Sequence, residues 1–219
     1  MREARRAFRA KRAERKKAAI YSSGEYWQDR MDLLYYGYVD FIMRTLAREA
    51  RSHLDVGTAN CPYQEWFDWI PERISFDRAP PYASGTVTGI EGDFMTYDFA
   101  RRFDVVTCLQ VLEHVPEAEA FTRRLMALGD LVILSVPFMW PAFMLEDHVH
   151  DPVSLEKVVG WAGREPNYQI VVEEPFRSRK RLIAVFDTRE AGAVWGKKDV
   201  HKRVRREARL AKSVLPQRG

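Results

Sequence analysis

Histidine side chains occur in two short stretches that could move a proton. His114 lies in a Leu-Glu-His-Val run, and His148 and His150 lie in a Glu-Asp-His-Val-His run. A neutral imidazole can accept a proton near pH 7. A hydroxyl group that attacks as a nucleophile must lose its proton, so it needs such a base. We therefore take His148 and His150 as the first candidates for a catalytic base, with His114 next.

Other uses of these histidines stay open. They could cap a helix or bond the backbone. In an extended chain alternate residues share a face, which would place Glu146, His148 and His150 together as possible metal ligands. Acids adjacent in sequence are usually solvated, and we expect no metal site.

Asp55 ends a short apolar run, and the small residues Gly57 and Ala59 follow it. This pattern predicts a parallel strand and a tight turn into a helix near Pro62, where a nucleotide-like cofactor can approach the backbone. Asp77 ends a second apolar run about 20 residues further on, the spacing at which a carboxylate accepts ribose hydroxyls.

Two further runs follow, 87–93 and the buried strand expected at 103–109. With the Leu-Glu-His-Val stretch, the chain resembles class I S-adenosylmethionine-dependent methyltransferases over residues 52–188, in particular the small single-domain kind that acts on small molecules and glycans. The resemblance implies S-adenosyl-L-methionine as cofactor. The cofactor-binding residues it implies are Asp55, Gly57, Thr58, Ala59, Asp77, Arg78, Asp93, Phe94, Leu109 and Gln110.

Within that set, the resemblance implies Asp55 and Gly57 near the methionine part, Asp77 at the ribose, and Asp93 with Phe94 at the adenine. Ala59 and Cys61 stand where the family more often has glycine, so we expect a slightly shifted helix after this turn. We expect most apolar residues of the leading helix to form core, and the resemblance also places Tyr26, Trp27, Tyr35 and Tyr36 of this helix beside the cofactor cleft.

The segment 137–152 follows the fifth expected strand, where open α/β sheets bind their ligands. It holds the bulky side chains Phe138, Trp140, Phe143 and Met144, which we expect to enclose an acceptor. Asp151-Pro152 replaces the aromatic pair usual in the family, while Ser154 and Leu155 match it.

Strands that alternate with helices predict an α/β fold: a Rossmann-like seven-stranded, mostly parallel sheet with one antiparallel edge strand and helices on both faces. We expect helices at 24–50, 118–128 and 154–161, and the later strands at 131–136, 169–173 and 182–186. The segment 78–86 is expected to be an open loop.

The net charge of +4 conceals two basic ends. Residues 1–20 and 197–219 each carry nine Lys or Arg against two acids, which leaves the part between them at −10. We expect a basic N-terminal extension (1–20), a methyltransferase domain (21–196) and a basic C-terminal extension (197–219). The extensions are expected to be solvated and partly helical, or to dock on an anionic partner such as an acidic protein, lipid headgroups or RNA.

Several classes of function lack support. No signal peptide or membrane-length apolar run occurs, so we expect a cytoplasmic protein. Cys61 and Cys108 have neither metal-ligand spacing nor a redox pattern, and we expect no disulfide. No phosphate-binding loop and no nucleophile turn of the hydrolase type is present.

The sequence thus favours methyl transfer from S-adenosylmethionine to an oxygen, less readily a nitrogen, of a small-molecule or sugar-containing acceptor. The alternatives are a non-catalytic binding protein of the same fold, supported by Ala59 and Cys61, and a nucleic-acid methyltransferase that uses the basic extensions.

Overall fold

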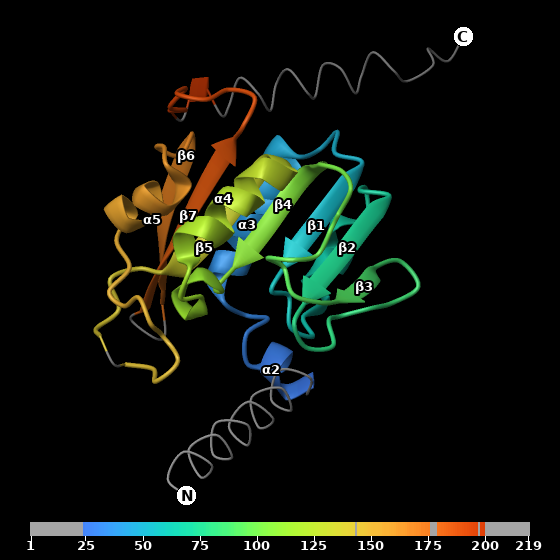
Figure 1. The fold of residues 1–219 in the computed structure, drawn as a ribbon, viewed down its shortest axis with the longest axis horizontal. Helices are drawn as coiled ribbons and strands as arrows, with labels where there is room; N and C mark the ends of the chain where they lie inside the picture. The colour runs from blue at the N-terminus through green and yellow to red at the C-terminus, as the bar shows by residue number, and fades with distance from the viewer. Residues whose placement is uncertain (1–23, 143, 176–178, 197, 200–219) are drawn as a thin grey trace, which may run out of the picture.

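The computed structural model describes residues 24–142, 144–175, 179–196 and 198–199 (Figure 1). The predicted extension 1–20, nearly all of the predicted extension 197–219, and Phe143 lie outside the described residues. Among the described residues, no helix is both long enough and apolar enough to cross a bilayer.

A seven-stranded sheet forms the centre of the domain, in the order β3-β2-β1-β4-β5-β7-β6. Neighbouring strands from β3 to β5 are parallel, whereas β7 is antiparallel to both of its neighbours. The expected Rossmann-like sheet is confirmed, and its antiparallel strand lies beside the edge strand β6. The strands are β1 (Ser52–Val56), β2 (Glu72–Asp77), β3 (Thr88–Glu91), β4 (Phe103–Leu109), β5 (Gly129–Pro137), β6 (Tyr168–Glu174) and β7 (Arg179–Asp187).

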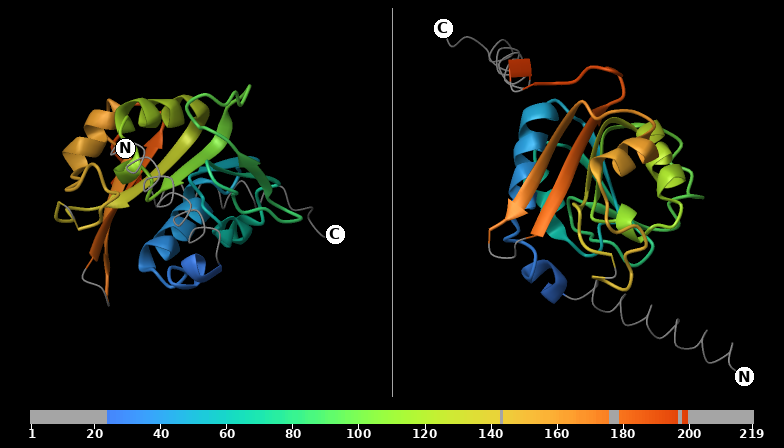
Figure 2. Two further views of the ribbon diagram at one scale, coloured as in Figure 1. Left: turned by 60° about the horizontal axis from the view of Figure 1, so that its bottom comes forward. Right: turned by 90° about the vertical axis from the view of Figure 1, so that its left-hand side faces the viewer.

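Helices cover both faces of the sheet, as expected (Figure 2). α3 and η1 pack on one face, and α4 and α5 pack on the other. Successive residues of β4 serve the two layers: Val105 faces α3 and Val106 faces α4. The central strands β4 and β5 are largely apolar because both of their faces are buried. The helices are α2 (Gly24–Gln28), α3 (Leu34–Leu46), η1 (Pro62–Phe67), η2 (Leu112–His114), α4 (Ala118–Leu128) and α5 (Leu155–Ala162).

The leading helix expected at 24–50 is wrong in its extent, because the chain forms two helices there. The Trp27 carbonyl accepts the N–H groups of Arg30 and Met31 in a turn after α2. α3 then begins at Leu34, whose N–H donates to Glu174 Oε2 at 2.7 Å, while the N–H of Tyr35 donates to Glu174 Oε1 at 3.2 Å. The first N–H groups of a helix have no partner inside it, so the carboxylate from β6 fixes where α3 starts.

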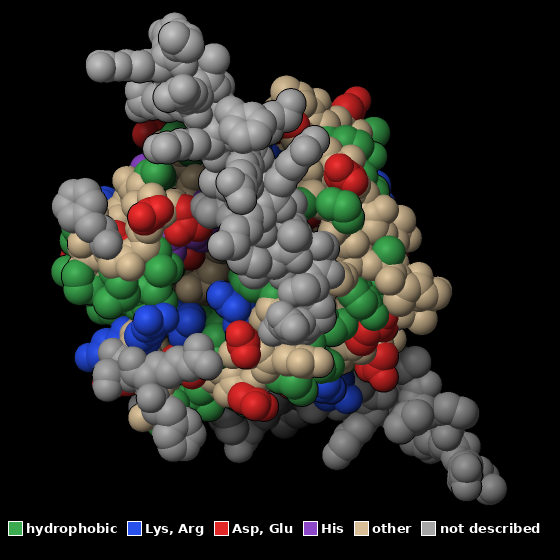
Figure 3. Space-filling view, turned by 90° about the horizontal axis from the view of Figure 1, so that it is seen from below, with side chains coloured by type: hydrophobic (Ala, Val, Ile, Leu, Met, Phe, Trp, Pro, Cys, Tyr) green, Lys and Arg blue, Asp and Glu red, His purple; other side chains and the backbone are tan. Residues whose placement is uncertain are grey.

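The order of the strands reverses between β1 and β4, which is where ligands of open parallel sheets bind. In Figure 1 the parallel strands end at the lower edge, near α2 and the segment 138–152. Figure 3 looks onto this edge and shows a hollow with acidic and histidine side chains on its rim. We call the edge at which the parallel strands end the carboxyl edge.

Candidate active site

The turn after β1 brings bare backbone to the carboxyl edge. Gly57 has φ +81°, a conformation that side-chain-bearing residues rarely adopt. A Cβ atom there would lie 2.3 Å from a methyl group of Val111, in the loop after β4. Ala59 has φ +50°, and the predicted helix after it is the short 3₁₀ helix η1. Position 57 therefore requires glycine, because a side chain there would collide with Val111 in the loop after β4.

Asp55, at the end of β1, is held by a chain of buried hydrogen bonds. The Gln64 amide donates to His53 Nδ1 at 3.2 Å and to the Ile74 carbonyl. His53 Nε2 then donates to Thr107 Oγ1 at 2.8 Å, and Thr107 donates to Asp55 Oδ1 at 2.6 Å. Asp55 Oδ2 has no hydrogen-bond partner among the described residues. Burial raises the pKa of Asp55 to about 6.

Asp77, at the end of β2, faces the same turn. Its Oδ2 accepts the N–H of Ala59 at 2.8 Å, and its Oδ1 accepts the N–H of Ala79 at 3.1 Å. The side chain is half-buried, and Arg78 beside it is exposed. A carboxylate has about four lone-pair positions, so two backbone bonds orient Asp77 and leave acceptor capacity for hydroxyl groups.

The two residues expected at the adenine differ in exposure. Asp93 is exposed after β3, and its Oδ1 accepts the N–H of Met95. The ring of Phe94 is buried in the core, 4.5 Å from the ring of Phe121 and 6.2 Å from that of Phe76. The Phe94 ring is therefore part of the core, and the Asp93 side chain is the exposed one of the two.

Gln110 leaves β4 with φ +58° and points towards β5 and β7. Its amide nitrogen donates to Ser135 Oγ at 3.1 Å, and its amide oxygen accepts Arg181 Nε at 3.1 Å. Leu109 and Thr58 are buried. These contacts fix the Gln110 side chain on the β5 side of the carboxyl edge, away from Asp77.

A second group of polar side chains lies after β4 and β5. Glu113, His114 and His148 each offer a ligand atom, and these atoms lie within 4.8 Å of one another. The rings of His114 and His148 meet edge to face with centroids 4.7 Å apart. Glu113 is only 1% exposed, its Oε2 has no partner among the described residues, and burial raises its pKa to about 8. We call these three residues the Glu113–His114–His148 cluster.

Neighbouring groups orient both imidazoles of the cluster. His148 Nδ1 lies 2.6 Å from Asp151 Oδ2, and the His148 ring stacks on Trp140 with centroids 5.8 Å apart. His114 Nδ1 lies 3.1 Å from the Asp147 carbonyl oxygen and 3.3 Å from its carboxylate. The N–H of Val149 also donates to the Glu113 carbonyl. The segment after β5 is therefore tied to η2.

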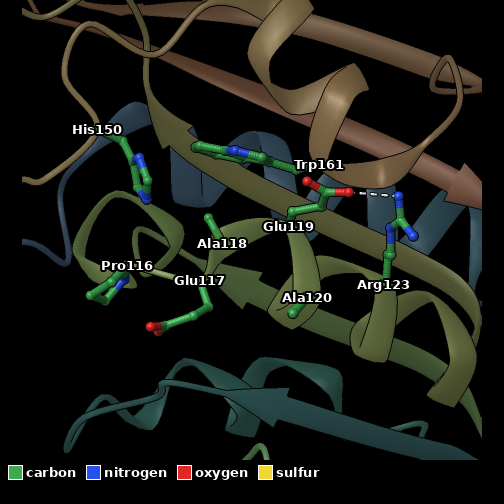
Figure 4. A pocket seen from close by; sticks show the side chains of 8 residues that line it. All are labelled: Pro116, Glu117, Ala118, Glu119, Ala120, Arg123, His150 and Trp161. Atoms are coloured by element: carbon green, nitrogen blue, oxygen red, sulfur yellow. Dashed lines mark hydrogen bonds and ion pairs between the residues drawn. The ribbon is translucent and has the colours of Figure 1, made fainter.

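His150 does not join this cluster. Its Nε2 lies 2.8 Å from the Val115 carbonyl, and its ring meets that of Trp161 on α5 at 5.1 Å. It lines a separate groove of about 430 Å³ between α4 and α5 (Figure 4). The alternative of an extended face shared by Glu146, His148 and His150 does not hold, because the segment turns where the His148 N–H bonds the Leu145 carbonyl.

Sequence motifs do not predict some residues of the site. Asp151 matters as the partner of His148, although in the sequence it stands out only as a replaced aromatic residue. Arg181 comes from β7, 71 positions after Gln110, and no local pattern connects the two. Of the leading aromatic residues, Trp27 and Tyr36 pack against Tyr63 and Trp66 of η1.

No protein-family model and no curated protein matches the sequence. Solved structures do resemble the domain. N-methyltransferase NodS from Bradyrhizobium japonicum WM9, in complex with S-adenosyl-L-homocysteine, has a TM-score of 0.60 at 12% identity over 78% of this chain and 95% of that one. The Burkholderia thailandensis 1,6-didemethyltoxoflavin-N1-methyltransferase has a TM-score of 0.60 at 16% identity, covering 79% and 88%.

The N-terminal domain of EvdMO1, solved with S-adenosyl-L-homocysteine bound, has a TM-score of 0.50 at 14% identity and covers 69% of this chain and 80% of that one. These likenesses establish the fold. The chain has the fold of class I S-adenosylmethionine-dependent methyltransferases, and its acids at the ends of β1 and β2 stand at the carboxyl edge of that fold.

Proposed function

We propose that this protein binds S-adenosyl-L-methionine at the carboxyl edge and transfers its methyl group to an oxygen of a small-molecule or sugar-containing acceptor. One observation carries the proposal. The Gly57 turn with Asp55 and Asp77 lies at the same edge of the sheet as the Glu113–His114–His148 cluster. A candidate cofactor site and a group that can handle the acceptor's proton thus lie at one edge of the sheet.

The residues of the first half fit the cofactor. Gly57 lets the turn after β1 adopt φ +81° without a side chain of its own, and Asp77 is oriented by two backbone N–H groups with acceptor capacity left for ribose hydroxyls. The unpartnered Asp55 Oδ2 is a buried acceptor, which costs free energy unless a donor reaches it. The ammonium group of the methionine part is such a donor.

The second half favours oxygen over nitrogen. The bound cofactor supplies an electrophilic methyl group on a sulfonium. A hydroxyl acceptor must lose its proton during attack, whereas a neutral amine can attack without prior deprotonation. The cluster of one buried carboxyl group and two oriented imidazoles is suited to removing that proton. Met139 and Met144 are exposed in the same segment and can pack against a ring-shaped acceptor, whereas Trp140 is buried and supports the His148 ring.

The experiment that tests this function follows a labelled methyl group. The protein is incubated with methyl-labelled S-adenosylmethionine and a panel of hydroxylated small molecules and sugars. Transfer to an acceptor oxygen supports the proposal. On that acceptor, His148→Ala should lower turnover by about 10²–10⁴ with little change in cofactor affinity, because the loss concerns proton removal and positioning.

His150→Ala is the comparison, since His150 lies in the groove between α4 and α5. Its loss of turnover should be much smaller than that of His148→Ala. Equal effects of the two variants would contradict the assignment of the proton-handling group to the cluster. If no acceptor in the panel becomes labelled, methyl transfer to this substrate class is contradicted.

A further inference from the structure

The donor atoms of the Glu113–His114–His148 cluster match a known type of metal site. Two imidazoles and one carboxylate are a common ligand set for divalent transition metals, and here the three donor atoms lie within 4.8 Å of one another. A metal–ligand bond to nitrogen or oxygen is about 2.0–2.2 Å long, so an ion placed among these atoms can reach all three with small side-chain adjustments.

The surroundings of the two histidines are those of metal ligands. A metal-bound histidine usually directs its other ring nitrogen to a carboxylate or a backbone carbonyl, which fixes the ring. His148 Nδ1 meets the Asp151 carboxylate at 2.6 Å, and both side chains are at most 3% exposed. His114 Nδ1 meets the Asp147 carbonyl at 3.1 Å. In both rings Nδ1 is engaged in this way, and Nε2 is the nitrogen a cation would take.

An independent observation comes from Glu113. Its side chain is 1% exposed, and its Oε2 has no hydrogen-bond partner among the described residues. Its other oxygen, Oε1, lies 3.9 Å from His114 Nε2. A buried carboxyl oxygen without a partner is unfavourable, and a bound cation would remove this cost.

We propose that Glu113, His114 and His148 bind one divalent transition-metal ion, with Asp151 and the Asp147 carbonyl as the groups that orient the two imidazoles. The mixed nitrogen and oxygen donors favour ions such as Mn²⁺, Fe²⁺ or Zn²⁺ over Ca²⁺, which prefers oxygen ligands. The three ligands would leave coordination positions for water or an acceptor.

The role of the ion rests on the proposed function, whereas the binding site does not. A divalent ion lowers the pKa of an oxygen ligand, as it does for bound water. An acceptor hydroxyl on this ion would lose its proton to solvent more readily, and its oxygen would then form a bond to the methyl carbon as the carbon–sulfur bond breaks. With the ion bound, the cluster would promote loss of the acceptor's proton through the ion, because both imidazoles would be ligands.

The test measures ion binding without any cofactor or acceptor. Tag-free, chelator-treated full-length protein is titrated with Mn²⁺ and followed by electron paramagnetic resonance, and Co²⁺ is added in parallel to record its visible spectrum. We expect one ion per chain. Glu113→Gln and His148→Ala should each weaken binding by more than 100-fold, and Asp151→Asn by about 10–100-fold, the effect of losing an orienting partner.

Glu146→Gln is the matched control, because Glu146 is an exposed acid of the same segment outside the cluster. It should bind Mn²⁺ as the parent does. Circular dichroism of each variant confirms that it is folded. The parent failing to bind Mn²⁺ or Co²⁺, or Glu113→Gln binding as tightly as Glu146→Gln, would overturn the proposal. A parallel titration with S-adenosyl-L-homocysteine shows separately whether the proposed function fails.

Discussion

Asp55 owes its orientation to side chains that no cofactor motif includes. Gln64, His53 and Thr107 form a buried chain of hydrogen bonds that ends on its carboxylate. In this chain His53 Nδ1 accepts and Nε2 donates, which only the neutral imidazole can do. Burial, together with the charge of Arg73, lowers the pKa of His53 to about 3. The chain therefore depends on His53 remaining uncharged.

This arrangement predicts a dependence of stability on pH. The unfolded chain protonates His53 below its usual pKa of 6.5, whereas the folded protein does so only near pH 3. The contribution is fully present above pH 6.5 and is lost as the pH falls, at up to about 1.4 kcal/mol per pH unit. Urea unfolding of the parent and of His53→Gln between pH 3.5 and 7.5 measures it.

The comparison with His53→Gln isolates this effect, because Asp55, whose pKa is raised to about 6, acts in the opposite direction in both proteins. The difference in unfolding free energy between parent and variant should grow in favour of the parent as the pH rises towards 6.5, then stay constant. A difference that does not change with pH would contradict a neutral buried His53.

At the scale of elements, α3 depends on a strand far away in sequence. Glu174 of β6 accepts the first two N–H groups of α3, and it also pairs with Arg181 of β7 at 3.1 Å. Both charged side chains are at most 7% exposed. One carboxylate thus joins α3 to the β6–β7 pair, and Arg181 in turn holds Gln110 at the carboxyl edge.

We predict that Glu174→Ala lowers the free energy of unfolding by about 3–5 kcal/mol, because it leaves Arg181 buried without its partner and the start of α3 uncapped. The matched control is Glu173→Ala. Glu173 pairs with Lys180 at 3.5 Å, but both are about half exposed or more, and such surface pairs are worth about 0–1 kcal/mol. Chemical denaturation should separate the variants, and equal losses would show that the buried pair is not what matters.

Elements that are defined by local sequence patterns can be predicted from the sequence, whereas those that depend on distant contacts cannot. Apolar runs locate the seven strands because the central strands are buried on both faces, and Ser154 marks the start of α5, where its Oγ accepts the N–H of Lys157. The break between α2 and α3 escapes prediction because its cap, Glu174, is 140 residues away. The grouping of Glu113 with His148 escapes for the same reason, since tertiary contacts and not spacing bring them together.

For the whole molecule, the described domain has its two core layers on either side of the sheet, formed by residues between Leu33 and Trp195. The basic segments 1–20 and 197–219, of which only residues 198 and 199 are described, carry few bulky apolar residues. We propose that these segments are separate extensions that attach the domain to an anionic partner.

Accordingly, a chain containing residues 21–196 should melt within a few degrees of the full-length protein and bind S-adenosyl-L-homocysteine with similar affinity. Binding of the full-length protein to anionic vesicles or RNA should weaken steeply with salt and disappear in the shortened chain. Calorimetric melting of both proteins measures the difference in melting temperature. A large drop in melting temperature would show that the extensions belong to the fold.

The central claim is that the carboxyl edge binds S-adenosylmethionine through the acids that end β1 and β2. Isothermal titration with S-adenosyl-L-homocysteine tests it most directly, with Asp77→Ala as the variant and Asp68→Asn, an exposed acid outside the site, as the control. We predict binding by the parent and the control, and a loss of about 1.5–3 kcal/mol in Asp77→Ala, the range for hydrogen bonds to a charged group. No binding by the parent, or equal affinity of Asp77→Ala and the parent, would contradict the claim.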